Sequence, residues 1–398
     1  MSGVLMVDNR GFNYFMVNVL YSLVSGLIYP SFPLYLRMSG LNVEFTSYAL
    51  TSMNIAGFAS SIMWGRVINR PENRRIAVLI GTIGGGLGYL TLAYIKGTLT
   101  IIAALVVLSI IAGGIYPTVM TLISETGGVE HMGYFWAGGS IGYAITTSFA
   151  GYVLEHMGIR PLFIISAIIY VSSAAILLNI VNYSTHRKPS DHATPLNTND
   201  ESFTLSLSAL YIVSVFILLF IDAVKNLYMP MFYVYEANVN MAYATATLSV
   251  EAFLEVPFIV MFVQLIRRNK ADSWTALSLS LALGSLYLVA NALLVRGTLS
   301  AFAAMASYSL VWASYSVSSS MIAPLISRGN RGLAYGIYNS VFPLANIIAP
   351  LCMGYSIASL GYRLSLILLS AVALVIALIA FLSRPLRSRI NKAVVNSP

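Results

Sequence analysis

Apolar runs of about 20 residues recur along the whole chain, and they constrain its fold more than any other feature. An α-helix of about 20 apolar residues spans the hydrocarbon core of a bilayer, where a helix is stable because it pairs its backbone polar groups internally. Such runs occupy residues 12–36, 44–65, 76–95, 98–121, 133–156, 161–182, 203–235, 241–266, 272–295, 298–320, 332–359 and 362–383. The sequence therefore predicts an all-α integral membrane protein with twelve transmembrane helices.

The composition agrees with a chain whose solvent is lipid. Of its 398 residues, 58% are hydrophobic and 9% are charged, whereas soluble domains carry about 25% charged residues. A single core in water could not bury so much apolar surface. Cys352 is the one cysteine, so no internal disulfide can form. Residues 1–10 are too short and polar for a secretory signal peptide, and none is expected.

The 22 basic residues are unevenly distributed along the chain, whose net charge is +8. With a cytoplasmic N-terminus, sixteen fall in cytoplasmic segments: Arg10, Arg66, Arg70, Arg74, Arg75, Arg187, Lys188, Arg267, Arg268, Lys270, Arg328, Arg331, Arg384, Arg387, Arg389 and Lys392. Five fall in outer loops, namely Arg37, Lys96, Arg160, Arg296 and Arg363, and Lys225 lies inside a span. Because cytoplasmic loops of membrane proteins are rich in Lys and Arg, both termini are expected in the cytoplasm and no nucleic-acid partner is expected.

The two halves of the chain repeat each other. Gly151-Tyr152, Gly158 and Arg160 recur 203 residues later as Gly354-Tyr355, Gly361 and Arg363. The long polar stretch between the halves predicts a cytoplasmic linker. We expect residues 1–182 to form one six-helix bundle, 183–202 the linker, and 203–398 a second, pseudo-symmetric bundle around a central cavity. Parallel repeats of this kind occur in secondary transporters.

The loop between the second and third spans carries a basic motif. It runs from Gly65 through Asn69 and Arg70 to Arg74 and Arg75. With six plus six spans, it resembles the signature of the major facilitator superfamily, although Asn69 stands where Asp is usual and the tail is one residue longer. The resemblance implies a monomeric secondary transporter without a cofactor or metal, in which this loop is a gating element.

The eighth span carries a second, shorter resemblance. Glu251 and the run Glu255-Val256-Pro257 are similar to the subgroup of lactose-permease-like symporters and sugar-efflux transporters. This implies transport of a sugar or a similar polar metabolite.

Four charged side chains lie well inside predicted spans, all in the second half: Asp222, Lys225, Glu251 and Glu255. A charge near the bilayer centre costs about 2.5–3.5 kcal/mol on insertion scales, so intramembrane charges are functional by default. Asp222 and Lys225 share a helical face at i, i+3 and can pair. Glu251 and Glu255 share one at i, i+4, where joint ionisation is disfavoured. These four are predicted to couple transport to protons; alternatively, Asp222 and Lys225 form a structural pair and the glutamates hydrogen-bond within the bundle.

Polar and aromatic stripes predict where the solute binds. Trp136, Ser140 and Tyr143 follow one helical face of the fifth span, and an offset of 203 maps them onto Asn339, Pro343 and Asn346 of the eleventh. Rings and amides in a central cavity suit a small polar organic ligand. Further substrate-binding candidates are Asn54 and Trp312. Alternatively, such polar residues join helices to one another.

Other functional classes find less support in the sequence. Gly138-Gly139-Ser140-Ile141-Gly142 fits the GxSxG pattern of serine hydrolases, but that motif works on a strand-to-helix turn, and here it lies in an apolar span. The chain contains no HExxH or Walker A motif, so an enzyme is not expected. Two alternatives stay open: a multidrug-type exporter with an apolar pocket, which the 12% aromatic content favours, and a non-transporting membrane receptor.

Overall fold

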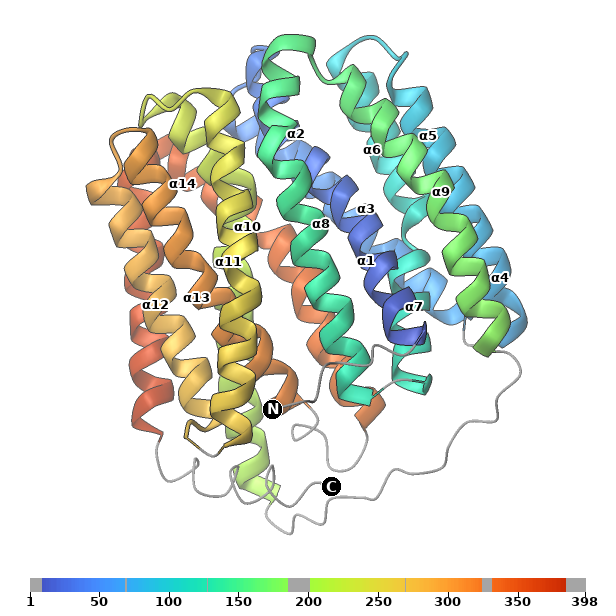
Figure 1. The fold of residues 1–398 in the computed structure, drawn as a ribbon. Coiled ribbons are helices and arrows are strands. Elements are labelled where there is room, and N and C mark those ends of the chain that lie inside the picture. The colour runs from blue at the N-terminus through green and yellow to red at the C-terminus, as the bar shows by residue number, and fades with distance from the viewer. Residues whose placement is uncertain are drawn as a thin grey trace. The chain divides into compact units, whose positions relative to one another are not determined.

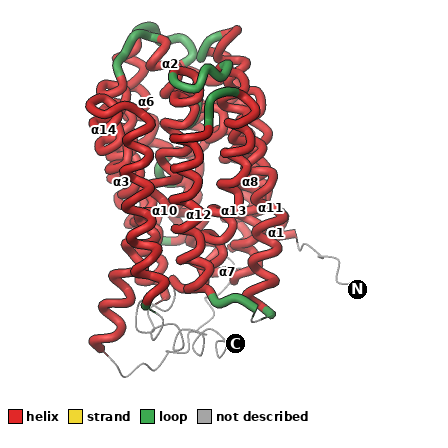
Figure 2. The backbone as a smooth tube through the Cα atoms, turned by 90° about the vertical axis from the view of Figure 1, so that its left-hand side faces the viewer, coloured by secondary structure: helices red, strands yellow, loops and turns green. Residues whose placement is uncertain are grey.

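The computed structural model describes residues 9–68, 70–126, 128–184, 201–268, 270–323 and 331–383. Within these ranges every regular element is a helix, and Figure 2 shows the helices joined by short loops. The first half contains α1 (Asn9–Ile28), α2 (Ser31–Met38), α3 (Val43–Ile68), α4 (Pro71–Leu79), the π-helical η1 (Ile80–Gly84), α5 (Gly85–Leu92), α6 (Thr98–Ala112), α7 (Ile115–Thr126), α8 (Gly128–Met157) and α9 (Arg160–Ser184). The second half contains α10 (Glu201–Tyr235), α11 (Met241–Arg267), α12 (Ser273–Leu294), α13 (Thr298–Ile322) and α14 (Arg331–Leu382).

The first ten apolar runs each coincide with a single helix or with consecutive helices: 12–36 with α1 and α2, 76–95 with α4, η1 and α5, and 98–121 with α6 and α7. The last two runs both fall in α14, which is interrupted at Gly361, where φ is 79° and ψ is 168°. Most of the expected linker lies outside the described residues. Eight stretches of the described helices are long and apolar enough to cross a membrane: Gly11–Met38, Pro71–Leu92, Thr98–Ile123, Arg160–Val181, Ser206–Tyr235, Met241–Ile266, Ser273–Leu294 and Ser340–Leu382.

Many large apolar side chains lie on the outside of these helices. Leu299, Leu382 and Leu294 are at least 70% exposed. Water-soluble proteins rarely leave contiguous apolar surface uncovered, whereas in lipid such side chains are well solvated. The outer surface is therefore one that suits a bilayer.

The chain divides into two compact units, and the division crosses α11. The first unit comprises Met1–Ser190 and Met241–Phe253, and the second comprises Asp191–Asn240 and Leu254–Pro398. The amino-terminal part of α11 therefore groups with the helices of the first half. Two contacts accompany this grouping: Gly151 N donates to Thr245 Oγ1 at 2.9 Å, and Ala242 N donates to a carboxylate oxygen of Glu155 at 3.3 Å.

In the first unit, α1 packs along α8 and also contacts α9, while α5 packs on α9 and α3 on α6 (Figure 1). The GxSxG pattern lies inside α8, as expected, and it explains the close approach of α1. A Cβ atom on Gly138 would overlap the carbonyl oxygen of Phe15, and one on Gly142 would overlap that of Val19. Glycines at i, i+4 thus let two helix backbones meet, as small residues do in membrane bundles.

In the second unit, α12 packs against α13 and α14, and α10 packs mainly against α14. Buried apolar side chains from α11, α12 and α13 form one of its core clusters: Phe262, Ile266, Ala276, Ala313 and Val317. Hydrogen bonds between helices supplement this packing. Tyr233 donates to Asn291 at 2.7 Å, and the hydroxyl groups of Ser285 and Ser370 lie 2.8 Å apart.

The repeated Gly-x-Arg motif has the same local role in each unit. Gly158 and Gly361 have φ values of 75° and 79°, a left-handed conformation that favours glycine. Each directs the chain into a helix that begins near an arginine. The guanidinium carbon of Arg160 lies 4.5 Å from the centre of the Tyr94 ring, and that of Arg363 lies 5.4 Å from the centre of the Phe232 ring.

Candidate functional site

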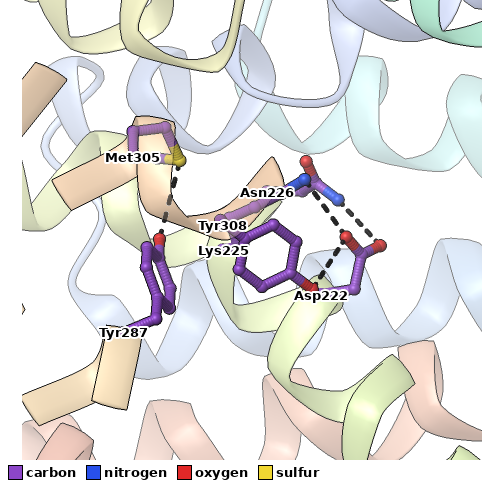
Figure 3. A network of polar contacts seen from close by, with 6 residues as sticks. All are labelled: Asp222, Lys225, Asn226, Tyr287, Met305 and Tyr308. Carbon is purple, nitrogen blue, oxygen red and sulfur yellow. Dashed lines mark hydrogen bonds and ion pairs between the residues drawn. The ribbon is translucent and has the colours of Figure 1, made fainter. Parts of the chain in front are cut away.

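Asp222, Lys225 and Asn226 form a buried polar network near the middle of α10 (Figure 3). Lys225 Nζ lies 3.2 Å from Asp222 Oδ1, which confirms that the two residues pair. Asn226 Nδ2 donates to Asp222 Oδ2 at 3.0 Å. The three residues share one face because they are spaced i, i+3 and i+4 along the helix.

Helix α13 completes the network from across the second unit. The hydroxyl group of Tyr308 donates to Asp222 Oδ1 at 3.3 Å, and Lys225 Nζ lies 4.5 Å from the centre of the Tyr308 ring. Trp312, one turn further along α13, places its ring centre 6.0 Å from Lys225 Nζ. Trp312 is half-buried, whereas Asp222, Lys225 and Tyr308 are buried. The ammonium group is therefore held by one carboxylate and two aromatic rings.

A second layer fixes the position of Tyr308. The ring of Tyr287 on α12 meets that of Tyr308 edge to face, with ring centres 4.9 Å apart. Tyr287 in turn donates a weak hydrogen bond to Met305 Sδ at 3.6 Å (Figure 3). A buried Tyr that packs on one side and hydrogen-bonds on the other has little freedom to rotate. The geometry around Lys225 is thus set by α10, α12 and α13 together.

Glu251 and Glu255 lie on one buried face of α11, as their spacing predicts. They are 0% and 4% exposed, whereas Phe253 and Leu254 between them are exposed. The division between the compact units falls between Phe253 and Leu254, so Glu251 groups with the first unit and Glu255 with the second. The predicted role of these carboxylates in proton coupling stays a prediction.

The stripe predicted on the fifth span lies on α8. Ser140 is buried, and Trp136 and Tyr143 are half-buried. Trp136 packs against a core cluster of the first unit that includes Tyr14 and Phe135. These contacts give Trp136 a packing role whether or not it also meets a solute.

The other substrate-binding candidates lie on three helices. Asn54 on α3 is half-buried. Asn346 on α14 is buried and donates to the Phe342 carbonyl of its own helix at 3.0 Å. Asn339 lies on α14, but its side chain is outside the described residues. Among these candidates, Trp312 approaches the charged network, with its ring centre 6.0 Å from Lys225 Nζ.

The loop predicted as a gating element joins α3 to α4. Asn69 lies outside the described residues. Arg74 is buried, and its Nε donates to the carbonyl of Ile68 at the end of α3, 3.2 Å away. Gly65 is half-buried, and Arg70 and Arg75 are exposed. Arg74 therefore ties the loop to the preceding helix, while the other two arginines face outward.

Sequence reasoning missed three polar residues that the structure makes prominent. Asn226 had a signal, because it lies four residues after Asp222 on the same face. Tyr308 had no signal in the sequence, because the packing of α13 alone brings it into contact with Asp222. Asn18 in α1 is buried and donates to the Phe135 carbonyl of α8 at 2.7 Å; an amide within an apolar span could have suggested it. Among the described residues, no cluster of His, Cys, Asp and Glu could hold a metal ion.

The long apolar helices of the described residues are typical of a membrane protein. The sequence profile of the Major Facilitator Superfamily matches residues 14–320 and 312–397, and the chain belongs to this superfamily. It is a multi-pass membrane protein of a transporter family, a class of proteins that are not enzymes. No curated protein matches the sequence.

Solved structures of transporters share the fold. A POT family transporter in complex with 5-aminolevulinic acid superposes on this chain with a TM-score of 0.75 at 12% identity. The match covers 96% of each chain. Tetrameric PepTSo2 gives a TM-score of 0.72 at 12% identity over 96% of this chain and 98% of that one. A mutant of the nucleoside transporter NupG gives 0.67 at 14% identity over 94% and 99%. At these identities the likeness shows the fold alone.

Proposed function

We propose that the chain is a proton-coupled secondary transporter that moves a small organic solute, a sugar or a similar polar metabolite, by alternating access. The observation that carries the proposal is the set of buried charged residues on α10 and α11. Asp222, Lys225, Glu251 and Glu255 are each less than 10% exposed within a superfamily of transporters. Intramembrane carboxylates mark ion and proton pathways in such proteins.

The proposed architecture has twelve spans in two six-helix bundles, with both termini on the cytoplasmic side of the cell membrane. Besides the eight apolar stretches, α3, α8 and α13 contain 26, 30 and 25 residues, and about 20 suffice to cross a bilayer. The stretch Ser340–Leu382 supplies two spans, because Gly361 interrupts it. Residues 1–182 and 203–398 would be the bundles, and a monomer would be the working unit.

The solutes of structural relatives support a small polar substrate. One POT family transporter was crystallised with 5-aminolevulinic acid, and NupG is a nucleoside transporter. By analogy, the solute-binding residues would include Trp136, Ser140, Tyr143, Asn54, Asn339, Asn346 and Trp312. The lactose-permease-like subgroup remains the proposed affiliation on the strength of Glu251 and Glu255.

A multidrug-type exporter is the second candidate function. The rings of Tyr308 and Trp312 beside Lys225 favour it, because aromatic faces bind varied organic cations.

The test uses the purified full chain in liposomes with an imposed pH gradient and a panel of labelled sugars and metabolites. We expect gradient-driven uptake or release of at least one solute, reduced at least about tenfold in Glu251→Gln and Glu255→Gln. Glu44→Gln is the matched control, because Glu44 is exposed in the first turn of α3. Dye export that is unchanged in Glu251→Gln and Glu255→Gln would favour the multidrug exporter. If no solute of the panel moved, the non-transporting membrane receptor would be the alternative that still stands.

A further inference from the structure

The arginine of the repeated Gly-x-Arg motif is tied to its own unit in the second half but not in the first. Arg363 donates to the carbonyls of Ala292 and Val295 at 2.5 and 3.1 Å, so its charge stabilises the carboxyl end of α12. Arg160 is exposed. Within the described part of the chain its guanidinium group lies over the Tyr94 ring but makes no hydrogen bond or ion pair.

The position of Arg160 over Tyr94 leaves its donors available. A guanidinium group that lies over an aromatic ring keeps the N–H groups at its edge free to bind a planar fork of oxygens, as a phosphate presents. Tyr94 is itself 62% exposed. The ring therefore orients the arginine without enclosing it.

A second free cation lies beside this pair. Lys96 follows Tyr94 by two residues and is exposed, and it too makes no hydrogen bond or ion pair among the described residues. The acidic residue nearest to Arg160 in the sequence is Glu155, whose carboxylate accepts from Ala242 N on α11 at 3.3 Å. Two positive charges thus lack a carboxylate partner, and an anion would balance them.

The two cations lie at the level where apolar spans end. Three stretches that are long and apolar enough to cross a membrane begin or end here: Pro71–Leu92, Thr98–Ile123 and Arg160–Val181. Tyr94 and Lys96 lie between the first two, and Arg160 begins the third. Tyr, Lys and Arg at the ends of spans meet the headgroup layer of a bilayer. The anion available at this depth is the phosphate of a lipid.

An exposed apolar strip continues from Tyr94 toward the centre of the spans. It consists of Leu87 and Leu90 on α5 and Val171 on α9, which are 57%, 41% and 50% exposed. Leu87, Leu90 and Tyr94 follow one another at helical spacing, on one face of α5. The two helices pack together (Figure 1), and a Cβ atom on Gly86 would overlap Val171. An acyl chain can lie along this strip.

We propose that the first unit binds an anionic phospholipid at this place. The lipid phosphate accepts hydrogen bonds from Arg160 and Lys96, Tyr94 holds the guanidinium group in position, and one acyl chain covers the strip of Leu87, Leu90 and Val171. Free phosphate would meet the same two cations but not the strip, so the proposal commits to a lipid. It goes beyond the proposed function, because the lipid is a bound partner of the protein and not the transported solute.

Native mass spectrometry of the purified full chain tests the proposal, with phosphatidylglycerol and phosphatidylcholine of the same acyl chains as probes. We expect the first phosphatidylglycerol to bind at least about fivefold more tightly than phosphatidylcholine, since each basic residue near a lipid surface contributes about that factor. Arg160→Gln and Lys96→Gln should each weaken phosphatidylglycerol binding by about fivefold. Arg296→Gln is the matched control, because Arg296 is exposed in the corresponding loop of the second unit; its binding should be unchanged.

Variants of Tyr94 test the positioning role of the ring. Tyr94→Leu keeps both cations and should weaken phosphatidylglycerol binding by about two- to fivefold, the usual effect of an exposed cation–π contact. Tyr94→Phe keeps the ring and should bind as the unmodified protein does. If Tyr94→Leu binds equally well, the ring has no positioning role.

Fluorescence quenching tests where the lipid lies. In a Cys352→Ser background, bimane is attached to Leu90→Cys on α5 or to Leu286→Cys, which is exposed on α12 of the second unit. We expect phosphatidylglycerol with brominated chains to quench the label at position 90 more than brominated phosphatidylcholine does. At position 286 the two lipids should quench equally.

Several results would overturn the proposal. They are equal affinity for the two lipids, a phosphatidylglycerol preference that persists in Arg160→Gln, or equal quenching by the two lipids at position 90. Displacement of phosphatidylglycerol by millimolar inorganic phosphate would show a site for a soluble anion instead. Thermal unfolding of Arg160→Gln, expected to be unchanged at this exposed position, separates lost binding from lost folding.

Discussion

At the scale of single residues, the pairing of Asp222 with Lys225 is what makes two charges tolerable inside the second unit. Both are buried, and their charged atoms lie 3.2 Å apart. Taking either charge out of water is costly, and removal of one partner leaves the other uncompensated. The two side chains should therefore be coupled in stability, whatever they do in transport.

A double-mutant cycle measures that coupling. We expect Asp222→Asn alone to lower the free energy of unfolding by about 3–5 kcal/mol, because it leaves a buried ammonium. Lys225→Met should cost less, because Asn226 and Tyr308 still donate to the Asp222 carboxylate. The double variant should lose less than the sum of the two, as measured by reversible unfolding in mixed micelles. Lys96→Met, at an exposed site, should change little; additive losses would show that the two charges act independently.

At the scale of elements, the packing of α1 on α8 depends on the absence of side chains. The backbone carbonyls of Phe15 and Val19 lie where a Cβ atom on Gly138 or Gly142 would be. In lipid, helices associate largely through such close packing. Substitution of either glycine should therefore destabilise the protein more than substitution of other glycines in the same unit.

Gly142→Ala should lower the free energy of unfolding by about 1–3 kcal/mol, the usual cost of overpacking. Gly57→Ala on α3 is the matched control, because a Cβ atom there would have no neighbour within 4 Å. That substitution should be neutral or stabilising by up to about 1 kcal/mol, since alanine favours helix more than glycine does. Thermal unfolding of both variants is the measurement, and an equal effect in the two would contradict a packing role for Gly142.

At the scale of the whole molecule, the distribution of arginine and lysine predicts how the chain is oriented. Lys96 is exposed and lies in a segment predicted on the outer side of the membrane. Arg268 is also exposed and lies in a segment predicted on the cytoplasmic side. In a Cys352→Ser background, Lys96→Cys should react with an impermeant maleimide added to intact cells. Arg268→Cys should react only after the membrane is opened. Labelling with the opposite sidedness would reverse the proposed topology.

The sequence by itself determined the class of protein and the positions of its helices. Apolar runs of bilayer length indicate that lipid is the solvent of these segments. The predicted spans therefore coincide with the helices α1 to α14. The i, i+3 pairing of Asp222 with Lys225 and the buried face shared by Glu251 and Glu255 were also predictable. Each depends only on the helical period, which is local. The linker and Asn69 lie outside the described residues.

The tertiary structure alone decided which groups surround the buried charges. Tyr308 and Trp312 lie more than 80 residues after Lys225, and their rings reach it only because of how α13 is rotated and shifted against α10. The pattern that resembles a hydrolase motif became a helix contact for the same reason: the glycines of α8 face α1. Local periodicity says which residues share a helical face, but the rotation and axial shift of each helix follow from packing against its neighbours. Charges inside the spans were therefore visible in the sequence, while the aromatic rings that surround Lys225 were decided only by the fold.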